Sequence, residues 1–481
     1  MPVFSKCRHT IKVYFEQRQR TAAPKPEKTR LKSVTATFTA AILAAQTLIA
    51  PLASAQGKLP LVRDVETENL LRQYAKPIFR AAGLPAGQVE IILVNDKSFN
   101  AFVPDSRRMF INLGVILDAK TPGEVIGVLA HETGHIAGNH LVRMRQAAAN
   151  AQIISVVGMI LGAGAAAAGA AAGSGGTTQG GAAAAMSSSA IGQRSFLAYK
   201  RTEEASADQA ALRYLERTKQ SPKGMLKTFE EMADQALFSA RYVDPYALSH
   251  PMPRERYNAL KTKAQRSKYF NIPAPKALQF KHEMVRAKLY AFTNHPSTVL
   301  KAYPPKNKSL PAQYARAVAS MQRDGVRKSV PKIDALIRKM PGNPYFYELK
   351  GQALLEGGKP KQAVAPFRKA LQYLPGDPQL EVWLGYAMVA SNDKSLLPQA
   401  KSVLQKALRK DPNSATGYAQ LAIAAGRMGD TATADLATAR SLLNRGDIRG
   451  AQRYAKRAKK KLKTGTPAWQ MADDILTIRA N

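Results

Sequence analysis

The stretch VLAHETGH at residues 128–135 is the most informative part of this chain of 481 residues, because it contains the pattern H-E-x-x-H. On an α-helix, His131 and His135 lie one turn apart on the same face, so both imidazoles can bind one zinc ion. Glu132 is placed to take a proton from a zinc-bound water, whose pKa the ion lowers from about 15.7 towards about 7. The chain has only seven histidines, so chance composition rarely produces this pattern. The stretch therefore predicts a zinc site with a general base beside it.

Catalytic zinc needs a third protein ligand and one open position. His140 follows His135 by five residues and points to another side of the helix, so we do not expect it to bind zinc. Further along, Glu204 and Asp208 stand four residues apart in a predicted second helix and share a face. One of these two carboxylates can bind the ion while the other holds a histidine ring. Glu203, the neighbour of Glu204, is expected to play no part in metal binding.

The residues around the motif predict an α+β unit over residues 56–270. A helical pattern at 70–83 precedes two β-rich stretches at 89–94 and 108–113. Thr121 and Pro122 then have the residue types that begin a helix, and that helix carries the zinc motif. The sequence thus predicts a small sheet with helices around it.

The remainder of the chain has a helical pattern and an internal repeat. NIPAPK at 271–276 is the predicted linker, and residues 277–481 follow it. Pro344, Pro378 and Pro412 are separated by two equal steps of 34 residues, which is the length of a tetratricopeptide (TPR) repeat. A non-repeating helical bundle would not explain these equal steps. The predicted fold class is therefore mainly α: an α+β zincin peptidase domain with a small sheet, followed by an all-α TPR solenoid.

The N-terminal segment has the layout of a secretory signal peptide. Residues 33–56 are uncharged, follow a basic segment and end in the small-residue pattern Ala53-Ser54-Ala55. We expect residues 1–55 to be removed by cleavage. The alternative is an uncleaved membrane anchor.

Another uncharged stretch, rich in Ala and Gly, lies at residues 151–173 and precedes SGGTTQGG at 174–181. We expect the first to form an apolar helix near the active site that makes peripheral contact with a membrane, and the second to be a flexible loop. The alternatives for 151–173 are a buried core helix or a true membrane span. The second zinc-site helix is expected to begin near Ser195.

The composition limits the classes of partner. Hydrophobic residues make up 45% of the chain and charged residues 22%, which is typical of a globular protein and too apolar for wholesale disorder. Lys and Arg number 71 against 34 Asp and Glu, a net charge of +37, which favours anionic surfaces. Aromatic residues are sparse in the basic segments, so we expect no nucleic-acid partner. Cys7 is the only cysteine, which excludes a disulfide framework.

Residues 60–260 resemble the HtpX/BepA-type gluzincin metallopeptidases. The matching stretches are VLAHETGH at 128–135, Asn100-Ala101-Phe102, Arg201-x-x-Glu204-x-x-Ala207-Asp208, and Ser249-His250-Pro251 with Arg256. The resemblance implies that Glu204 is the third zinc ligand and that Asp208 and Arg256 support the ligands from behind. It also implies a catalytic part for His250, as a fourth ligand or as a contact to the transition state. Residues 100–102 would be an edge strand that holds the substrate backbone.

A leader, a peptidase domain and a TPR domain in this order are similar to the periplasmic BepA-type branch of that family. The resemblance implies a periplasmic, membrane-associated zinc metalloendopeptidase with one Zn²⁺ per chain. Its substrates would be unfolded or misassembled proteins, and its role the quality control and assembly of outer-membrane proteins, with the TPR domain contacting the assembly machinery. The alternative is a TPR scaffold or chaperone whose zinc site is normally closed.

Overall fold

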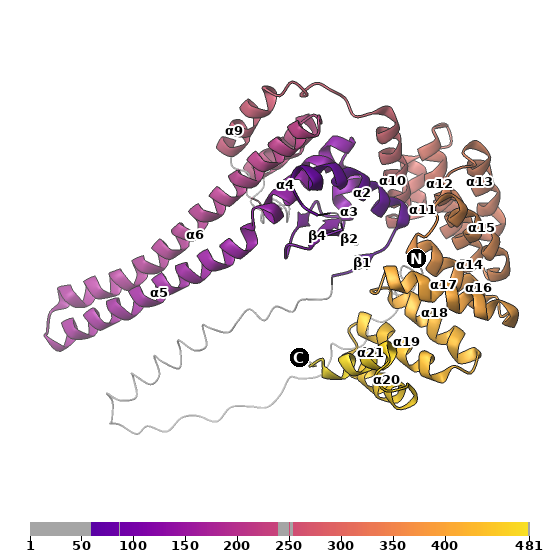
Figure 1. Ribbon diagram of the computed structural model, residues 1–481. Helices are drawn as coiled ribbons and strands as arrows, with labels where there is room; N and C mark the ends of the chain where they lie inside the picture. The colour runs from indigo at the N-terminus through magenta and orange to yellow at the C-terminus, as the bar shows by residue number, and fades with distance from the viewer. Residues whose placement is uncertain (1–58, 86, 239–249, 251–253, 480–481) are drawn as a thin grey trace, which may run out of the picture. The chain divides into compact units, whose positions relative to one another are not determined.

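The structure is a computed structural model that describes residues 59–85, 87–238, 250 and 254–479 (Figure 1). Within it, residues 61–481 form one compact unit. The fold is mainly α with one small sheet, as the sequence predicts. The predicted signal peptide lies outside the described residues, and its cleavage stays a prediction.

The sheet has four strands in the order β1-β2-β4-β3. Their bounds are Leu61–Val62 for β1, Glu90–Val94 for β2, Ala101–Phe102 for β3 and Arg108–Asn112 for β4. β2 and β4 run parallel, with Ile92 opposite Phe110, whereas β1 and β3 add at the two sides in antiparallel fashion. β3 is therefore an edge strand among the described residues.

Three helices contact this sheet: α2 (Val65–Ala81), α3 (Leu113–Asp118) and α4 (Pro122–Ala137), which contains the H-E-x-x-H motif. α2 presents buried Leu71, Tyr74 and Ile78 at helical spacing and packs against β2 and α4. α4 begins as predicted, with Pro122 in its first turn and a capping box between Thr121 and Glu124. The H-E-x-x-H motif thus lies in a helix whose residues are nearly all buried.

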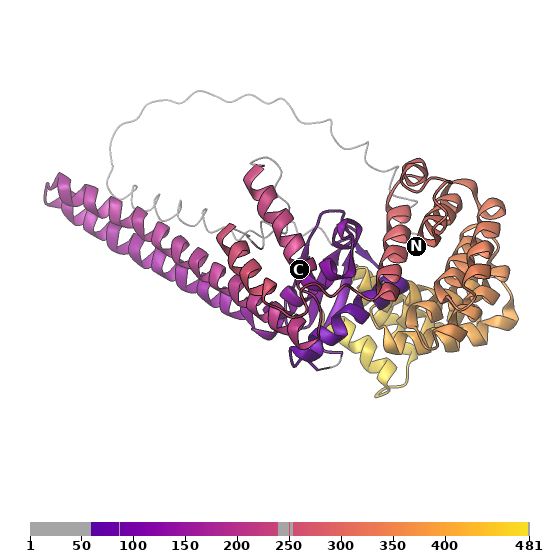
Figure 2. The ribbon, with the colours of Figure 1, turned by 90° about the horizontal axis from the view of Figure 1, so that it is seen from above.

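Helices α5 (His140–Ala171) and α6 (Gly175–Arg217) pack against each other as an antiparallel hairpin (Figures 1 and 2). The prediction of a flexible loop at 174–181 and of a helix start near Ser195 is wrong, because α6 already begins at Gly175. Ser174 caps it by accepting a hydrogen bond from the Thr177 amide. Glycine costs helical stability when a helix is isolated, and in this structure α6 packs along α5.

After α6, the chain forms α7 (Lys223–Phe238) and α9 (Arg254–Gln265), and then a continuous series of helices. Their bounds are α10 Lys276–Thr293, α11 Pro296–Ala302, α12 Leu310–Asp324, α13 Val326–Lys339, α14 Pro344–Glu356, α15 Pro360–Tyr373, α16 Pro378–Ala390, α17 Leu397–Lys410 (preceded by the 3-10 turn Lys394–Leu396), α18 Ala415–Arg427, α19 Thr431–Asn444, α20 Ile448–Lys461 and α21 Pro467–Thr477.

The 34-residue step in the sequence corresponds to a repeated packing contact. A Cβ on Gly351 of α14 would lie 2.7 Å from the Phe367 ring of α15, and one on Gly385 of α16 would lie 2.5 Å from Leu404 of α17. Glycine at each position lets the first helix of a pair approach a large side chain of the second. This recurrence agrees with a repeat, and the assignment to the TPR class stays a prediction.

Helix α10 lies after the predicted linker 271–276 but contacts the part of the structure that precedes it. His282 is fully buried, with Nδ1 3.1 Å from the Tyr74 hydroxyl and Nε2 2.9 Å from the Ala119 carbonyl oxygen. Nε2 must donate to that carbonyl, so Nδ1 accepts from the tyrosine. These contacts do not test the predicted domain boundaries. They hold α10 against residues that precede the predicted linker.

Candidate metal centre and active site

Helix α4 carries three residues of the predicted site on buried positions. His131, Glu132 and His135 are all at most 5% exposed. Between them, Gly134 allows α6 to approach, since a Cβ there would lie 2.9 Å from the Ala207 carbonyl oxygen. The glycine inside the motif therefore has a packing reason: it lets α6 bring its acids to the histidines.

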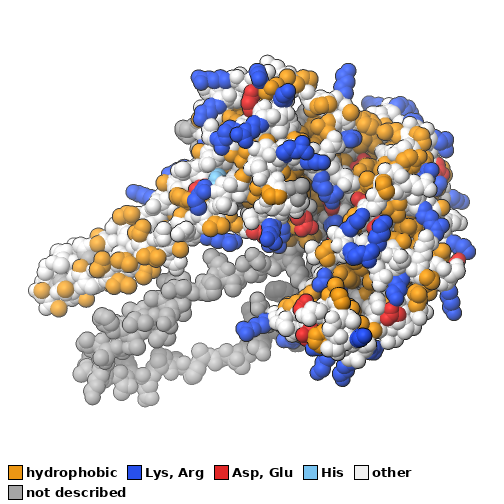
Figure 3. All heavy atoms as spheres, viewed as in Figure 1, with side chains coloured by type: hydrophobic (Ala, Val, Ile, Leu, Met, Phe, Trp, Pro, Cys, Tyr) orange, Lys and Arg blue, Asp and Glu red, His pale blue; other side chains and the backbone are white. Residues whose placement is uncertain are grey.

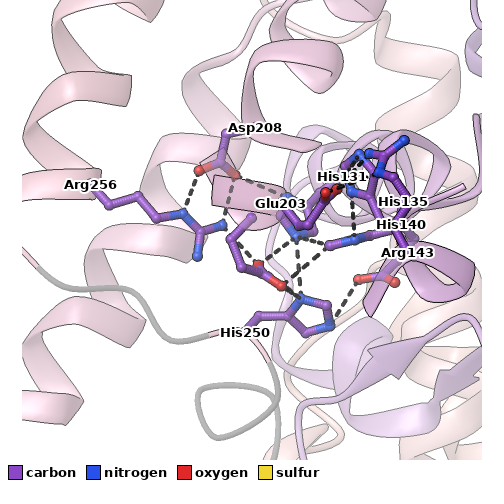
Figure 4. A network of polar contacts seen from close by, with 10 residues as sticks. His131, His135, His140, Arg143, Glu203, Asp208, His250 and Arg256 are labelled. Atoms are coloured by element: carbon purple, nitrogen blue, oxygen red, sulfur yellow. Dashed lines mark hydrogen bonds and ion pairs between the residues drawn. The ribbon is translucent and has the colours of Figure 1, made fainter. Parts of the chain in front are cut away.

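Four of the predicted residues meet in one cluster. His131, His135, Glu204 and His250 each offer a ligand atom, and these atoms all lie within 4.8 Å of one another (Figure 4). The two histidine Nε2 atoms are 3.1 Å apart, and Glu204 oxygens lie 3.4 Å from His131 and 3.5 Å from His135. Ligands bound at 2.0–2.1 Å around a tetrahedral ion are about 3.3 Å apart. The donor set, two imidazoles and a carboxylate with a third imidazole beside them, fits a metal ion.

The charges in the cluster favour an ionised carboxylate. Burial raises the pKa of Glu204, but the His250 charge and hydrogen bonds from the three histidines outweigh it, so the pKa lies well below its usual value. Burial lowers the pKa of His131, but hydrogen bonds with Asp208 and Glu204 raise it to about 9. A cation in the cluster would therefore replace a proton on His131, which couples metal binding to pH.

Asp208 and Arg256 support His131 from the side away from the cluster. Nδ1 of His131 lies 2.9 Å from Asp208, and the guanidinium of Arg256 binds both oxygens of that carboxylate at 2.6 and 3.0 Å. Arg256 also lies 3.1 Å from Glu204. With Nδ1 of His131 donating to Asp208, its Nε2 is the nitrogen that would lose a proton and bind metal.

A second support, which sequence reasoning missed, holds His135. Its Nδ1 lies 3.1 Å from Nδ1 of His140, whose Nε2 lies 3.1 Å from Glu203. Arg143 binds the Glu203 carboxylate at 2.7 and 3.0 Å. The chain of donors is consistent if His135 donates to His140 and His140 donates to Glu203. This arrangement leaves Nε2 of His135 available to a metal ion.

The signal for this support was present in the sequence. Two consecutive acids at 203 and 204 cannot face the same way on a helix, so a second basic partner was required for Glu203 once both were buried. The prediction that His140 does not join the ligand cluster agrees with its position behind His135.

Glu132 and His250 lie next to the ligand cluster, apart from the residues that support His131 and His135. Glu132 is fully buried, and its Oε1 lies 3.6 Å from Nε2 of His250, whose Nδ1 lies 3.0 Å from Glu204. His250 thus stands between the ligand carboxylate and the predicted base. The segments on either side of it, 239–249 and 251–253, lie outside the described residues.

The predicted substrate-binding residues are placed on the edge strand and not in the cluster. Asn100 precedes β3 and accepts a hydrogen bond from the Asn112 amide through its carbonyl oxygen. Ala101 and Phe102 form β3, where the Phe102 ring stacks on Phe110 at 5.1 Å. β3 also contacts α4. Their role in binding substrate stays a prediction.

A buried helix bearing two imidazoles, a carboxylate from a neighbouring helix and a glutamate beside them define a metallopeptidase. Comparison with known proteins agrees: residues 65–264 match the model of the family described as peptidase family M48. The chain is 23% identical to the β-barrel assembly-enhancing protease of Escherichia coli strain K12, over 82% of this chain and 83% of that protein. It is 24% identical to the protein of the same name from Yersinia pestis, over 77% and 74%. The protein is a metal-dependent protease, and the alternative of a pure scaffold is not favoured.

Proposed function

We propose that this protein is a periplasmic zinc metalloendopeptidase of the gluzincin type that acts in the assembly and quality control of outer-membrane β-barrel proteins. The observation that carries the enzymatic part is the cluster of His131, His135 and Glu204 beside the buried Glu132. The β-barrel part is supported by the name of the relatives, and the periplasmic part by the uncharged segment 33–56 with its small-residue end.

In this mechanism His131, His135 and Glu204 would hold one zinc ion, which would supply Lewis acidity for the attack of water on a peptide carbonyl. Glu132 takes the proton of the attacking water and delivers it to the nitrogen of the departing amine. Asp208 and Glu203, each tied to an arginine, keep the two histidines in the tautomer that presents Nε2.

In this proposal the two ring nitrogens of His250 face two different carboxylates. Its Nδ1 faces Glu204 and its Nε2 faces Glu132. It serves either as a fourth ligand or as a hydrogen-bond donor to the oxyanion that forms on the attacked carbonyl. His250→Gln separates the two roles: loss of a ligand lowers metal affinity, whereas loss of the donor lowers kcat at unchanged metal content.

The repeats are proposed to bind a partner of the protease, namely the outer-membrane assembly machinery or an unfolded substrate. Stacked helical pairs form extended surfaces suited to binding another protein.

The test of the enzymatic part uses residues 57–481, which contain the whole compact unit. Wild type should contain one zinc ion per chain and degrade an unfolded outer-membrane barrel protein. Glu132→Gln should keep the zinc and lose activity by at least about a hundredfold, because a base contributes about 10²–10⁴-fold. Glu90→Gln, which changes an exposed glutamate of β2, is the matched control. Equal activity of wild type and Glu132→Gln would refute the assignment of the base.

A further inference from the structure

The α5–α6 hairpin leaves a long uncharged surface exposed. No Asp, Glu, Lys or Arg occurs between Arg145 and Arg194. Large apolar side chains of this stretch face solvent, among them Ile153, Ile154, Val157, Ile160, Leu161 and Ile191. In Figure 3 the hairpin carries hydrophobic side chains (orange), whereas Lys and Arg side chains (blue) are scattered over the rest of the visible face.

The distribution of side chains within the hairpin is the reverse of that in a water-soluble helical pair. The residues of α5 that meet α6 are small: a Cβ on Gly158 would lie 2.1 Å from the Ser188 Cβ, and one on Gly192 of α6 would lie 2.6 Å from the Ala151 carbonyl oxygen. At about 100° per residue, the large side chains from Ile153 to Leu161 cover an outer arc of about 220°. Small residues between helices and large apolar ones outside are typical of helices packed in lipid.

The dimensions and flanking charges fit a bilayer. The helix from His140 to Ala168 is long and apolar enough to cross a membrane, and almost none of it is buried within the protein. Its uncharged part, residues 146–171, extends about 39 Å at 1.5 Å per residue, against a hydrocarbon thickness of about 30 Å. Arg145 and Arg194 are exposed at the end of the hairpin that joins α4, where anionic headgroups would meet them.

We propose that the α5–α6 hairpin inserts into a phospholipid bilayer with anionic headgroups, with Arg145 and Arg194 at its surface. Because α5 begins at His140 and α6 carries Glu204, insertion holds the metal centre directly at the membrane surface. This inference goes beyond the proposed function and does not depend on catalysis. It also replaces the single membrane-touching segment 151–173 with a two-helix element.

The experiment measures flotation of residues 57–481 with vesicles of phosphatidylcholine and phosphatidylglycerol. This form omits the segment 33–56, which would bind lipid by itself. Wild type should float with the vesicles. Ile160→Asp combined with Leu161→Asp should reduce the bound fraction at least about tenfold, because aspartate is strongly disfavoured in the hydrocarbon core. Both side chains are well exposed, at 65% and 68%, so the fold should be retained. The matched control is Ile423→Asp in α18, 41% exposed, which should float like wild type.

A second measurement uses the absence of cysteine beyond Cys7. Leu161→Cys labelled with an environment-sensitive dye should shift to the blue when vesicles are added, whereas Met428→Cys should not. Wild type that stays in solution, or equal flotation of the double variant, would overturn the proposal. So would an oligomer in water that the double variant abolishes while neither form floats, since the surface would then bind a second copy of the chain.

Discussion

A buried group of ionisable side chains should make the stability of this protein fall as pH rises. Lys288 of α10 lies 2.7 Å from Asp64, 3.5 Å from Glu66 and 3.8 Å from Glu348, and all four residues are at most 6% exposed. Burial raises the pKa of Glu348 to about 8 and that of Glu66 to about 7 against the attraction of Lys288. Burial also acts on Asp64, but the charge and hydrogen bond of Lys288 outweigh it, and its pKa is lowered. One ammonium group thus keeps one carboxylate ionised, and the other two carboxyl groups stay protonated to near neutral pH.

The size of the effect follows from the pKa of Glu348. The carboxyl group keeps its proton to about pH 8 in the folded chain, against an ordinary value of 4.5 when unfolded. Between these values the folded state binds one more proton, so the free energy of unfolding falls by about 1.4 kcal/mol per pH unit. The contribution is fully present below pH 4.5 and is lost as pH rises through about 8. Glu348→Gln keeps the shape of the side chain and removes this titration.

The assay is urea unfolding followed by circular dichroism at pH 5.5 and 7.5. From pH 5.5 to pH 7.5, the free energy of unfolding of wild type should fall by about 2–3 kcal/mol more than that of Glu348→Gln. Glu356→Gln, which removes an exposed carboxylate from the same helix α14, should behave like wild type. If wild type and Glu348→Gln lost the same amount, Glu348 would not carry a proton in the folded protein and the reasoning would be wrong.

Three further results are expected. Glu204→Gln should abolish stable metal binding, whereas Glu203→Gln should weaken metal affinity by about 10–100-fold, because Glu203 holds His140 behind His135. Dialysis against chelators measures both affinities. Unchanged affinity in Glu203→Gln would show that Glu203 does not support the site. Gly134→Ala should lower the free energy of unfolding by about 1–3 kcal/mol, because its methyl group would press on the backbone of Ala207, and an unaltered thermal midpoint would contradict the packing argument. Amino-terminal sequencing of the protein purified from cells should begin at Gln56, and a chain beginning at Met1 would exclude cleavage.

The parts of the site that the sequence could predict are those governed by local periodicity. The spacing of His131 and His135 fixes their common face on any helix, and the i, i+4 relation of Glu204 and Asp208 does the same on α6. The structure brings these residues together with one carboxylate in the cluster and the other behind His131. Local periodicity also predicts the two longer strands, β2 and β4, and the residue types at 121–122 predict the start of α4, since capping depends on neighbouring residues only.

The parts that could not be predicted depend on contacts between distant segments. The glycine-rich residues 174–181 have a poor helical propensity, yet α6 begins at Gly175 with Ser174 as its cap, and further along the helix packs against α5. The part of Glu203 depends on His140 and Arg143, which are about 60 residues away in sequence and become neighbours because α5 and α6 pack against each other.

The contacts of α10, the helix that follows the predicted linker 271–276, also depend on segments distant in sequence. The composition of residues 271–276 describes how the backbone behaves locally, but it carries no information on what the next helix packs against. Three side chains of α10 bind the carbonyl oxygens that lead into α4: Arg286 donates to Leu117, His282 to Ala119 and Gln279 to Lys120. Leu117 lies in the last turn of α3, and Ala119 and Lys120 lie between α3 and the helix that carries the predicted metal ligands. α10 therefore contacts the segment that leads into α4, and through the ion pairs of Lys288 with Asp64 and Glu348 it also contacts the start of α2 and helix α14.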